Sequence, residues 1–319
     1  MIKILQVRNI DSFVESRRQK TSEKDRKTVQ AILNDVRKNG DSAVKKYERK
    51  FNGRKTSQLR VSAKEIKEAQ SKISREEIYA LYSMSCDIGG QSSALMDDLR
   101  TLANKKYRVG YPGSSDLKRL FIPIPSVGCY IPGGQARYPS SVIMSVVPAK
   151  RAGVKRIVVV SPPGPDGKID PLTIEAAVKY GATEIYKVGG AQAIGALAYG
   201  TKSISKVDKI VGPGGKFVSI AKSLVSDQTA IDMVAGPTEL GIIADASSDP
   251  ELVALDLISQ AEHSKDTMCF VITTSKTVAK QIQKSLEKLI PDVERSAIVK
   301  QSISKNGFIA VCKNQNEMV

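Results

Sequence analysis

The single histidine of the chain, His263, stands in the stretch SQAEHSKD, three residues after Gln260. On a helix, side chains at positions i and i+3 share a face, so this imidazole and this amide can approach the same cation. Imidazole nitrogen and amide oxygen both suit a borderline ion such as Zn²⁺. A zinc site, however, takes at least three protein ligands. Taken alone, His263 is better explained as an imidazole stabilised by the negative end of a helix.

Two glycine-rich stretches are candidates for binding a phosphate-bearing ligand. VGGAQAIGA places Gly189 and Gly190 before a helical pattern, and VGPGGKFVS places Gly212, Gly214 and Gly215 before another. Glycine lets the backbone approach a ligand closely, and the first amides of a helix suit phosphate groups. Neither stretch matches the G-x-G-x-x-G dinucleotide fingerprint. Tight turns and a dinucleotide site are therefore equally good interpretations.

Other reactive side chains have simpler explanations. Ser140 and Ser141, in YPSSVIM, stand where a helix begins, and hydroxyls commonly cap such a start. Thr238 and Glu239 follow a Gly-Pro turn, where they could contact a polar substrate or simply be solvated. Cys269 lies in the apolar run TMCFVITT without a neighbouring base or cation to lower the pKa of its thiol. A buried structural thiol is a better interpretation than a nucleophile.

The secondary-structure patterns that must position these residues are of two kinds. The N-terminal third predicts helices, one from Ser22 to a stop at Gly40 and the next capped by Asp41 and ending at Gly53. Two capping boxes open further helices, Ser62 with Glu65 and Ser74 with Glu77.

From about residue 140 onward, strand and helix patterns alternate. The β-branched run VKRIVVVSPP is typical of a strand buried on both faces, and TEIYKVGG, VDKIVGPGG, ELGIIAD and TMCFVITT are further strands separated by helical patterns. The helix before His263 is predicted to be capped near Asp249. Such β-α-β units require parallel pairing, so the fold class is α/β with Rossmann-like sheets. Ligands of these sheets bind beyond the carboxyl ends of the strands, where the glycine-rich stretches lie.

Length and composition limit the class of protein. A chain of 319 residues suits two domains, and no stretch has the apolar length of a membrane span or a secretory signal. The four cysteines are scattered without C-x-x-C spacing, which argues against a zinc ribbon and for reduced cytoplasmic thiols. The chain ends just after an apolar strand-like run, which suggests an incomplete chain.

The net charge of +16 raises the hypothesis of nucleic-acid binding. Much of the excess lies in the first 60 residues, but it is interleaved with acidic residues at helical spacing. Aromatic residues make up only 5% of the chain and Trp is absent, so no basic-aromatic ladder exists. A solvated helical surface is the favoured interpretation.

Five motifs, in their order and spacing, resemble the histidinol dehydrogenase family: YIPGGQARYPSSVIMSVVPAKRAGV, VGGAQAIGALAYGT, KVDKIVGPGGKFVSIAK, IDMVAGPTELGIIAD and DLISQAEHS. The likeness is strong from about residue 105 to residue 275. Members of the family are zinc-dependent homodimers that oxidise L-histidinol to L-histidine in two NAD-dependent steps, through an aldehyde. The resemblance implies this activity, both cofactors and a cytoplasmic homodimer. It implies two Rossmann-like domains, which we place at residues 1–124 with 239–319 and at residues 125–238.

The resemblance also assigns site residues. Gln260 and His263 match two zinc ligands that lie where the substrate binds, and Thr238 matches a substrate-contacting serine. Tyr130, Gln192 and Gly215 match residues that contact the dinucleotide. Two departures stand out, since the family usually carries Asn at the position of Gly215 and Ser at that of Thr238.

The catalytic Glu-His pair of the family is expected just beyond residue 319, and the remaining Asp and His zinc ligands further on, the last from a partner subunit. Alcohol oxidation needs a base with a pKa near the working pH, normally His, and His263 is committed to the metal. We therefore expect no catalytic base within these 319 residues and a truncated, impaired enzyme. The alternative is a non-catalytic relative that keeps the fold to bind a ligand or partner.

Overall fold

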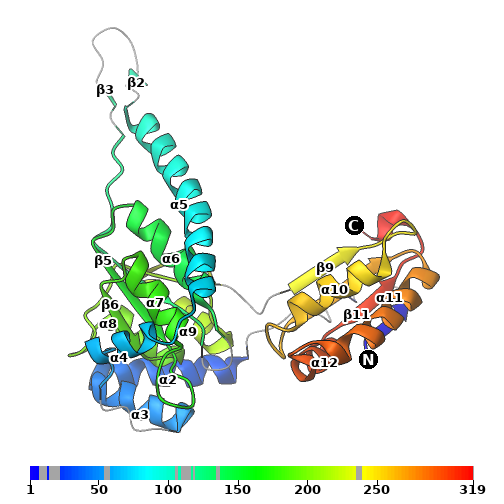
Figure 1. Cartoon of the computed structure of the whole chain (residues 1–319), viewed down its shortest axis with the longest axis horizontal. Helices are drawn as coiled ribbons and strands as arrows, with labels where there is room; N and C mark the ends of the chain where they lie inside the picture. The colour runs from blue at the N-terminus through cyan, green and yellow to red at the C-terminus, as the bar shows by residue number, and fades with distance from the viewer. Residues whose placement is uncertain are drawn as a thin grey trace. The chain divides into compact units, whose positions relative to one another are not determined.

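A computed structural model describes the chain at residues 1–6, 13, 22–53, 58–104, 107–108, 116–117, 119–133, 137–234 and 239–318. The chain forms two compact units (Figure 1). The larger unit is Ser22–Val234, and the smaller unit joins Met1–Thr21 to Ala235–Val319.

The larger unit is built on a five-stranded parallel sheet in the order β6-β5-β4-β7-β8. The chain starts at the central strand β4, moves outward through β5 to β6, and then returns to the other side of β4 as β7. The crevice for a ligand is expected beyond the carboxyl ends of β4 and β7, where this order reverses. The strands are β4 (Ser126–Tyr130), β5 (Arg156–Ser161), β6 (Glu184–Lys187), β7 (Lys209–Val211) and β8 (Ala230–Ile231).

Helices cover both faces of this sheet. On one face, alternate residues of β5 such as Val158 and Val160 share a core with α8 (Gly190–Tyr199) and α9 (Lys216–Val225). On the other face, Ile157 and Val159 share a core with α6 (Pro139–Arg151) and α7 (Pro171–Tyr180). The prediction that β5 is buried on both faces is confirmed, as is the α/β class with two parallel sheets.

The N-terminal helices form outer layers of the larger unit. These helices are α2 (Glu23–Asn39), α3 (Asp41–Asn52), α4 (Ala63–Gln70) and α5 (Arg75–Asn104). Helices α2 and α3 pack on α8, α4 packs on α7, and α5 packs on α6. Contact between α2 and α8 is close, because a Cβ at Gly195 would lie 3.2 Å from Leu33 and 3.3 Å from Val36.

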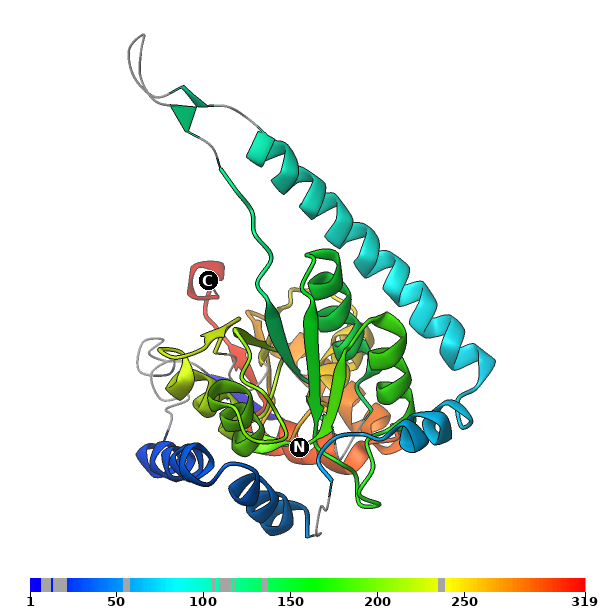
Figure 2. The same cartoon turned by 90° about the vertical axis from the view of Figure 1, so that its left-hand side faces the viewer.

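The structure therefore divides the chain differently from the sequence-based boundaries. Residues 22–124, which we had grouped with residues 239–319, belong to the same unit as the second predicted domain. The physical reason is the apolar face of α2, where Val29, Leu33 and Val36 are fully buried against α8 and α9. Figure 2 shows α5 running past the sheet toward a short antiparallel pair, β2 (Tyr107–Arg108) and β3 (Asp116–Leu117).

Local signals at the helix ends are mostly confirmed. Both capping boxes form, with Ser62 and Ser74 exchanging hydrogen bonds with the glutamates three residues on. The cap predicted at Asp41 is wrong. Asp41 is the first residue of α3, and its carboxylate instead accepts hydrogen bonds from the amide and hydroxyl of Ser203, at 3.2 and 2.6 Å.

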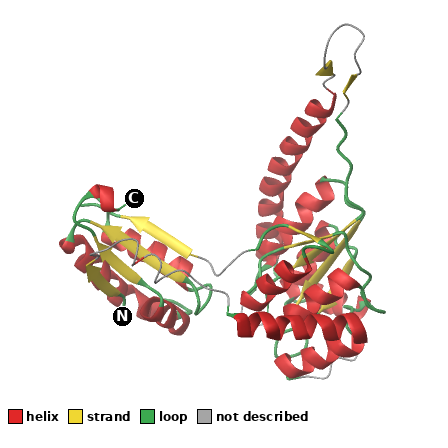
Figure 3. Ribbon diagram, turned by 180° about the vertical axis from the view of Figure 1, so that it is seen from behind, coloured by secondary structure: helices red, strands yellow, loops and turns green. Residues whose placement is uncertain are grey.

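The smaller unit is a four-stranded parallel sheet in the order β1-β11-β10-β9. Helices α10, α11 and α12 share one core with alternate strand residues such as Cys269 and Val271, so they cover one face (Figure 3). On the opposite face Phe270 stacks on Phe308 with ring centres 5.0 Å apart. The elements are β1 (Lys3–Gln6), β9 (Glu239–Ile243), α10 (Pro250–Ala261), β10 (Met268–Thr273), α11 (Lys276–Leu289), η1 (Ile290–Asp292), α12 (Ser296–Lys305), β11 (Phe308–Val311) and η2 (Gln315–Glu317).

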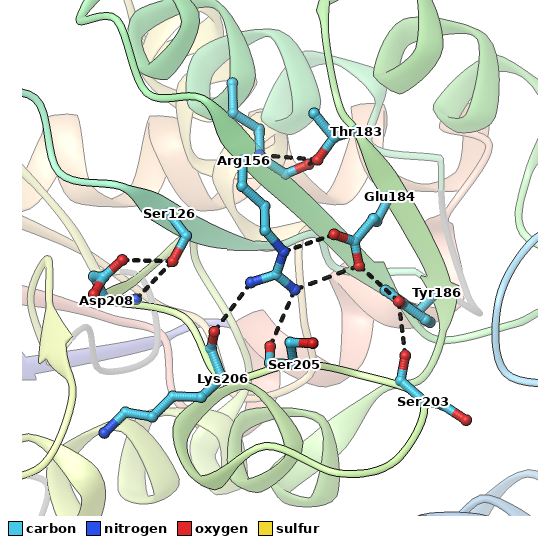
Figure 4. A network of polar contacts seen from close by, with 10 residues as sticks. Ser126, Arg156, Thr183, Glu184, Tyr186, Ser203, Ser205, Lys206 and Asp208 are labelled. Carbon is cyan, nitrogen blue, oxygen red and sulfur yellow. Dashed lines mark hydrogen bonds and ion pairs between the residues drawn. The ribbon is translucent and has the colours of Figure 1, made fainter.

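The amino edge of the larger sheet is held by a polar network (Figure 4). Arg156 Nε donates to Glu184 Oε1 at 2.6 Å, and the Arg156 Nη groups donate to the carbonyls of Lys206 and Ser205 at 3.0 and 3.1 Å. Tyr186 Oη donates to Glu184 Oε2 at 2.7 Å. Burial opposes ionisation of Glu184, but the hydrogen bonds from Arg156 and Tyr186 outweigh it, so the pKa of Glu184 is lowered. The loop before β7 is thereby tied to the starts of β5 and β6.

Candidate functional site

The carboxyl edge of the larger sheet brings Tyr130 together with the two glycine-rich junctions. Tyr130 ends β4, and its side chain is buried below the start of α8, where its Oη accepts a hydrogen bond from the amide of Gly190 at 3.1 Å. Burial raises the pKa of the Tyr130 phenol to about 12, so the group stays neutral near pH 7. The backbone of the same residue touches the second junction, since a Cβ on Gly212 would lie 2.1 Å from the Tyr130 carbonyl oxygen.

Gln192 lies in the first turn of α8 and is held by a carboxylate that the sequence analysis missed. Its Nε2 donates to Glu48 Oε1 at 2.8 Å, and the same oxygen accepts the amide of Gly189 at 2.9 Å. Glu48 belongs to α3 and is fully buried. No local pattern predicts this contact, because Glu48 lies 144 residues before Gln192, in a helix whose charged residues suggest a solvated surface.

The other end of the Gln192 amide has no protein partner. In the part of the chain that the structure describes, Gln192 Oε1 is one of two buried side-chain polar atoms without a hydrogen bond. The side chain is 1% exposed. An unsatisfied buried acceptor costs about 1–3 kcal/mol, so an atom of this kind calls for a water or a ligand donor.

The turn between β7 and α9 is shaped by Gly212 and by a buried ion pair. Gly212 has φ +109°, in the left-handed region, and its amide donates to Asp232 Oδ2 at 2.8 Å. Lys222 of α9 is 2% exposed, pairs with Asp232 and donates to the Gly212 carbonyl at 3.0 Å. Burial opposes ionisation of Asp232, but the hydrogen bonds, led by that from Lys222, keep the pKa of Asp232 lowered. These two residues were also missed by the sequence analysis.

Gly215 faces open space at the start of α9. It is the N-cap residue of that helix, has φ −66°, and no atom lies within 4 Å of the position its Cβ would take. Amides in the first turn of a helix lack intrahelical partners, and the helix dipole favours an anion there. The junction can therefore admit either a larger side chain or a negatively charged ligand group.

A pocket of about 240 Å³ opens beside this edge, between the ends of β4 and β5 and the start of α7. Three of its four charged side chains, Arg137, Lys168 and Asp170, are in ion pairs. Arg137 contacts Glu77 at 2.9 Å and Asp170 at 2.8 Å, and Lys168 contacts Glu68 at 2.6 Å. The pocket therefore offers little unpaired charge to a ligand. Neighbouring Ser140 and Ser141 lie in the first turn of α6, whose N-cap residue Tyr138 makes no side-chain cap hydrogen bond.

In the smaller unit, Gln260 and His263 stand at the end of α10. The helix ends at Ala261, so His263 lies in the turn that follows, and its amide donates to the Gln260 carbonyl at 3.2 Å. Asp249 caps the start of α10, as predicted. His263 Nδ1 lies 3.1 Å from the carbonyl oxygen of Ser259. Because a carbonyl only accepts, Nδ1 is the donor in this contact, and in a neutral imidazole Nε2 is then the nitrogen that can bind another ligand.

Among the described residues, no group of three or more His, Cys, Asp or Glu side chains could hold a metal ion by itself. Thr238 lies outside the described residues. Cys269 is fully buried, and burial raises the pKa of its thiol to about 11, which confirms it as a structural thiol rather than a nucleophile. Among the helices that are described, none is long and apolar enough to cross a bilayer.

Comparison with known proteins adds a family relationship. The family model described as histidinol dehydrogenase matches residues 15–319. Histidinol dehydrogenase from Bacillus licheniformis is 42% identical over 298 residues, which cover 93% of this chain and 68% of that protein. The enzyme of that name from Methanosarcina barkeri is 40% identical over 293 residues, which cover 92% of this chain and 66% of that protein.

A solved structure shows the same relationship. The crystal structure of histidinol dehydrogenase from Elizabethkingia anophelis matches with a TM-score of 0.84 and 32% identity, over 98% of this chain and 71% of that chain. The chain thus spans about two thirds of the length of the curated relatives it matches.

Proposed function

The chain belongs to the histidinol dehydrogenase family, a family of oxidoreductases, and from this premise we propose that the whole protein oxidises L-histidinol to L-histidine with NAD⁺ as the hydride acceptor. The reaction passes through the aldehyde in two oxidations. We propose that the protein acts as a cytoplasmic homodimer, as its family does.

The dinucleotide is assigned to the carboxyl edge of the larger sheet. The observation that carries this assignment is Gln192 Oε1, a buried acceptor that no described residue satisfies, at the start of α8 where Tyr130 from the end of β4 also binds. Tyr130 offers a neutral phenol from the end of β4, and Gly215 leaves the start of α9 open to a phosphate. The residue set fits a dinucleotide, although Gly215 lacks the side-chain amide usual in the family, so we expect weak binding.

Gln260 and His263 are proposed as two of the zinc ligands. The lone pair on His263 Nε2, set by the Nδ1 contact with Ser259, fits a metal-bound imidazole. Zinc, when bound, acts as a Lewis acid that holds the substrate's imidazole and amino group. The remaining protein ligands are proposed to come from parts of the whole protein outside these 319 residues. Thr238, next to the first residue of β9, is proposed to contact the substrate through its hydroxyl.

The base for both oxidations is proposed to be a Glu-His pair outside these residues, because His263 is the single histidine here and its free nitrogen is committed to the metal. The role of His263 is then binding and orientation of the substrate rather than proton transfer.

The test is histidinol-dependent NADH formation by the whole protein, measured together with its zinc content. We expect turnover, and we expect His263→Ala to lower both zinc content and turnover. The 319-residue chain by itself should bind NAD without turnover. Family-level turnover by that chain would contradict the assignment of the base.

A further inference from the structure

We infer that Glu48 is a positioning residue, which fixes the amide of Gln192 so that its oxygen is offered to the dinucleotide. The inference rests on the proposed function, because the contact between Gln192 and NAD is itself a proposal. Glu48 acts through the Gln192 side chain and through the backbone amide of Gly189 beside it.

The orientation of the Gln192 amide follows from the chemistry of its partner. In the recorded contact the amide turns its Nε2 toward Glu48 Oε1, at 2.8 Å, and this oxygen is an acceptor because it also takes the hydrogen bond of the Gly189 amide. If the amide flipped, two acceptor oxygens would face each other in a buried setting, which is costly. Glu48 thus removes the two-fold ambiguity that a glutamine side chain otherwise has.

The same carboxylate oxygen also secures the backbone around Gln192. It accepts the amide of Gly189 at 2.9 Å, while Tyr130 Oη accepts the amide of Gly190. The two amides at the start of α8 are therefore satisfied by the protein. The polar group left to bind a ligand at this junction is Gln192 Oε1, which has no partner in the described part of the chain.

The contact with Glu48 fixes which end of the Gln192 amide is available: its oxygen is placed to accept a hydrogen bond from an O–H or N–H of the dinucleotide. The acceptor is already in place before the ligand arrives, so the entropy of ordering a free glutamine side chain is not lost on binding. Removal of the acceptor on Glu48 should release the Gln192 amide and weaken NAD binding without changing the chemistry.

The test is a double-mutant cycle in the whole protein with NAD affinity, kcat and thermal unfolding as readouts. Glu48→Met keeps the side-chain volume and removes the acceptor, and Gln192→Met does the same for the amide. Each single variant should weaken NAD binding roughly three- to tenfold, the loss of one net hydrogen bond. The double variant should bind NAD no more weakly than Gln192→Met, because Glu48 acts through Gln192.

Two conservative variants separate geometry from charge. Glu48→Gln keeps an oxygen that accepts from both amides and should restore NAD affinity to within roughly twofold of the unaltered protein. Glu48→Asp keeps a carboxyl group but shortens the side chain by one methylene, so its oxygen should no longer reach the Gln192 amide and NAD binding should weaken. This variant provides the test if Glu48→Met does not fold. As a matched control, Glu184→Gln removes a partly buried carboxylate at the amino edge and should lower stability without changing NAD affinity.

The outcomes are distinguishable. If Gln192→Met weakens NAD binding and the Met and Asp variants of Glu48 do not, the inference is overturned while the proposed function stands. If the effects of Glu48→Met and Gln192→Met on NAD affinity multiplied in the double variant, Glu48 would act independently of Gln192 and the inference would be overturned. If Glu48→Gln lost as much NAD affinity as Glu48→Met, Glu48 would act through its charge, which would also overturn the inference. Unchanged NAD affinity in Gln192→Met would remove the dinucleotide assignment and this inference together.

Discussion

The two edges of the same five-stranded sheet are built in opposite ways. At the amino edge, Arg156 and Glu184 pair with each other and tie the loop before β7 to the strands. At the carboxyl edge, Gln192 keeps an acceptor that no described residue satisfies, and the described residues leave open space around Gly215. The difference indicates that fully paired polar groups stabilise one edge, while the other edge keeps groups available for a ligand.

The largest effect is expected from disturbing the close contact between the Gly212 and Tyr130 backbones at the carboxyl edge. Gly212→Ala places a Cβ 2.1 Å from the Tyr130 carbonyl oxygen in a residue with φ +109°. We expect a loss of about 3 kcal/mol or more in the free energy of unfolding, measured by urea denaturation. Gly215→Ala is the matched control, with open space at its Cβ and φ −66°, and should cost less than about 1 kcal/mol. Equal losses in the two variants would contradict the role given to Gly212.

A smaller effect is expected at the amino edge. Arg156→Met leaves the Glu184 carboxylate, whose side chain is only 18% exposed, without its cation. Because both side chains keep some contact with water, we expect a loss of about 2 kcal/mol in the free energy of unfolding. NAD affinity, measured by calorimetric titration, should stay unchanged. If Arg156→Met lost NAD affinity at a temperature where the variant is fully folded, the two edges would not be independent.

The pH dependence of stability tests the ion pair between Glu184 and Arg156 at the amino edge. The pKa of Glu184 in the folded protein lies below its ordinary value of 4.5, so its contribution to stability is present above pH 4.5 and is lost as the pH falls through the folded value. The difference in unfolding free energy between the unaltered protein and Glu184→Gln, about 1.5 kcal/mol at neutral pH, should therefore shrink on acidification. A constant difference down to pH 3 would contradict the ionised pairing with Arg156.

The smallest expected effect is a gain at the carboxyl edge. Gly215→Asn fills the open space at the start of α9 with the amide that the family usually carries. We expect NAD to bind roughly three- to tenfold more tightly, the contribution of one hydrogen bond. Gly215→Ala, which adds bulk without an amide, should not tighten binding. If both variants bind NAD equally well, Gly215 is not beside the dinucleotide.

Helix ends and strands were predictable because their signals are local. The capping boxes at Ser62 and Ser74, the Asp249 cap and the buried strand β5 all follow from residues within one or two turns. Tyr130 and Gln192 were assigned by resemblance, and the structure joins both to the start of α8. Asp41 was misassigned because a carboxylate at a helix start can also bind a distant loop, here Ser203.

The sequence by itself determined the α/β class, the order of the elements, the glycines at the junctions and the family. The tertiary structure decided which distant groups meet: Glu48 with Gln192, Lys222 with Asp232, and α2 with α8 rather than with the smaller unit. Backbone conformation depends on neighbouring residues, and the sequence displays them directly. Pairing across 144 residues depends on how helices pack and on which buried polar atoms remain unsatisfied, and no local pattern encodes either.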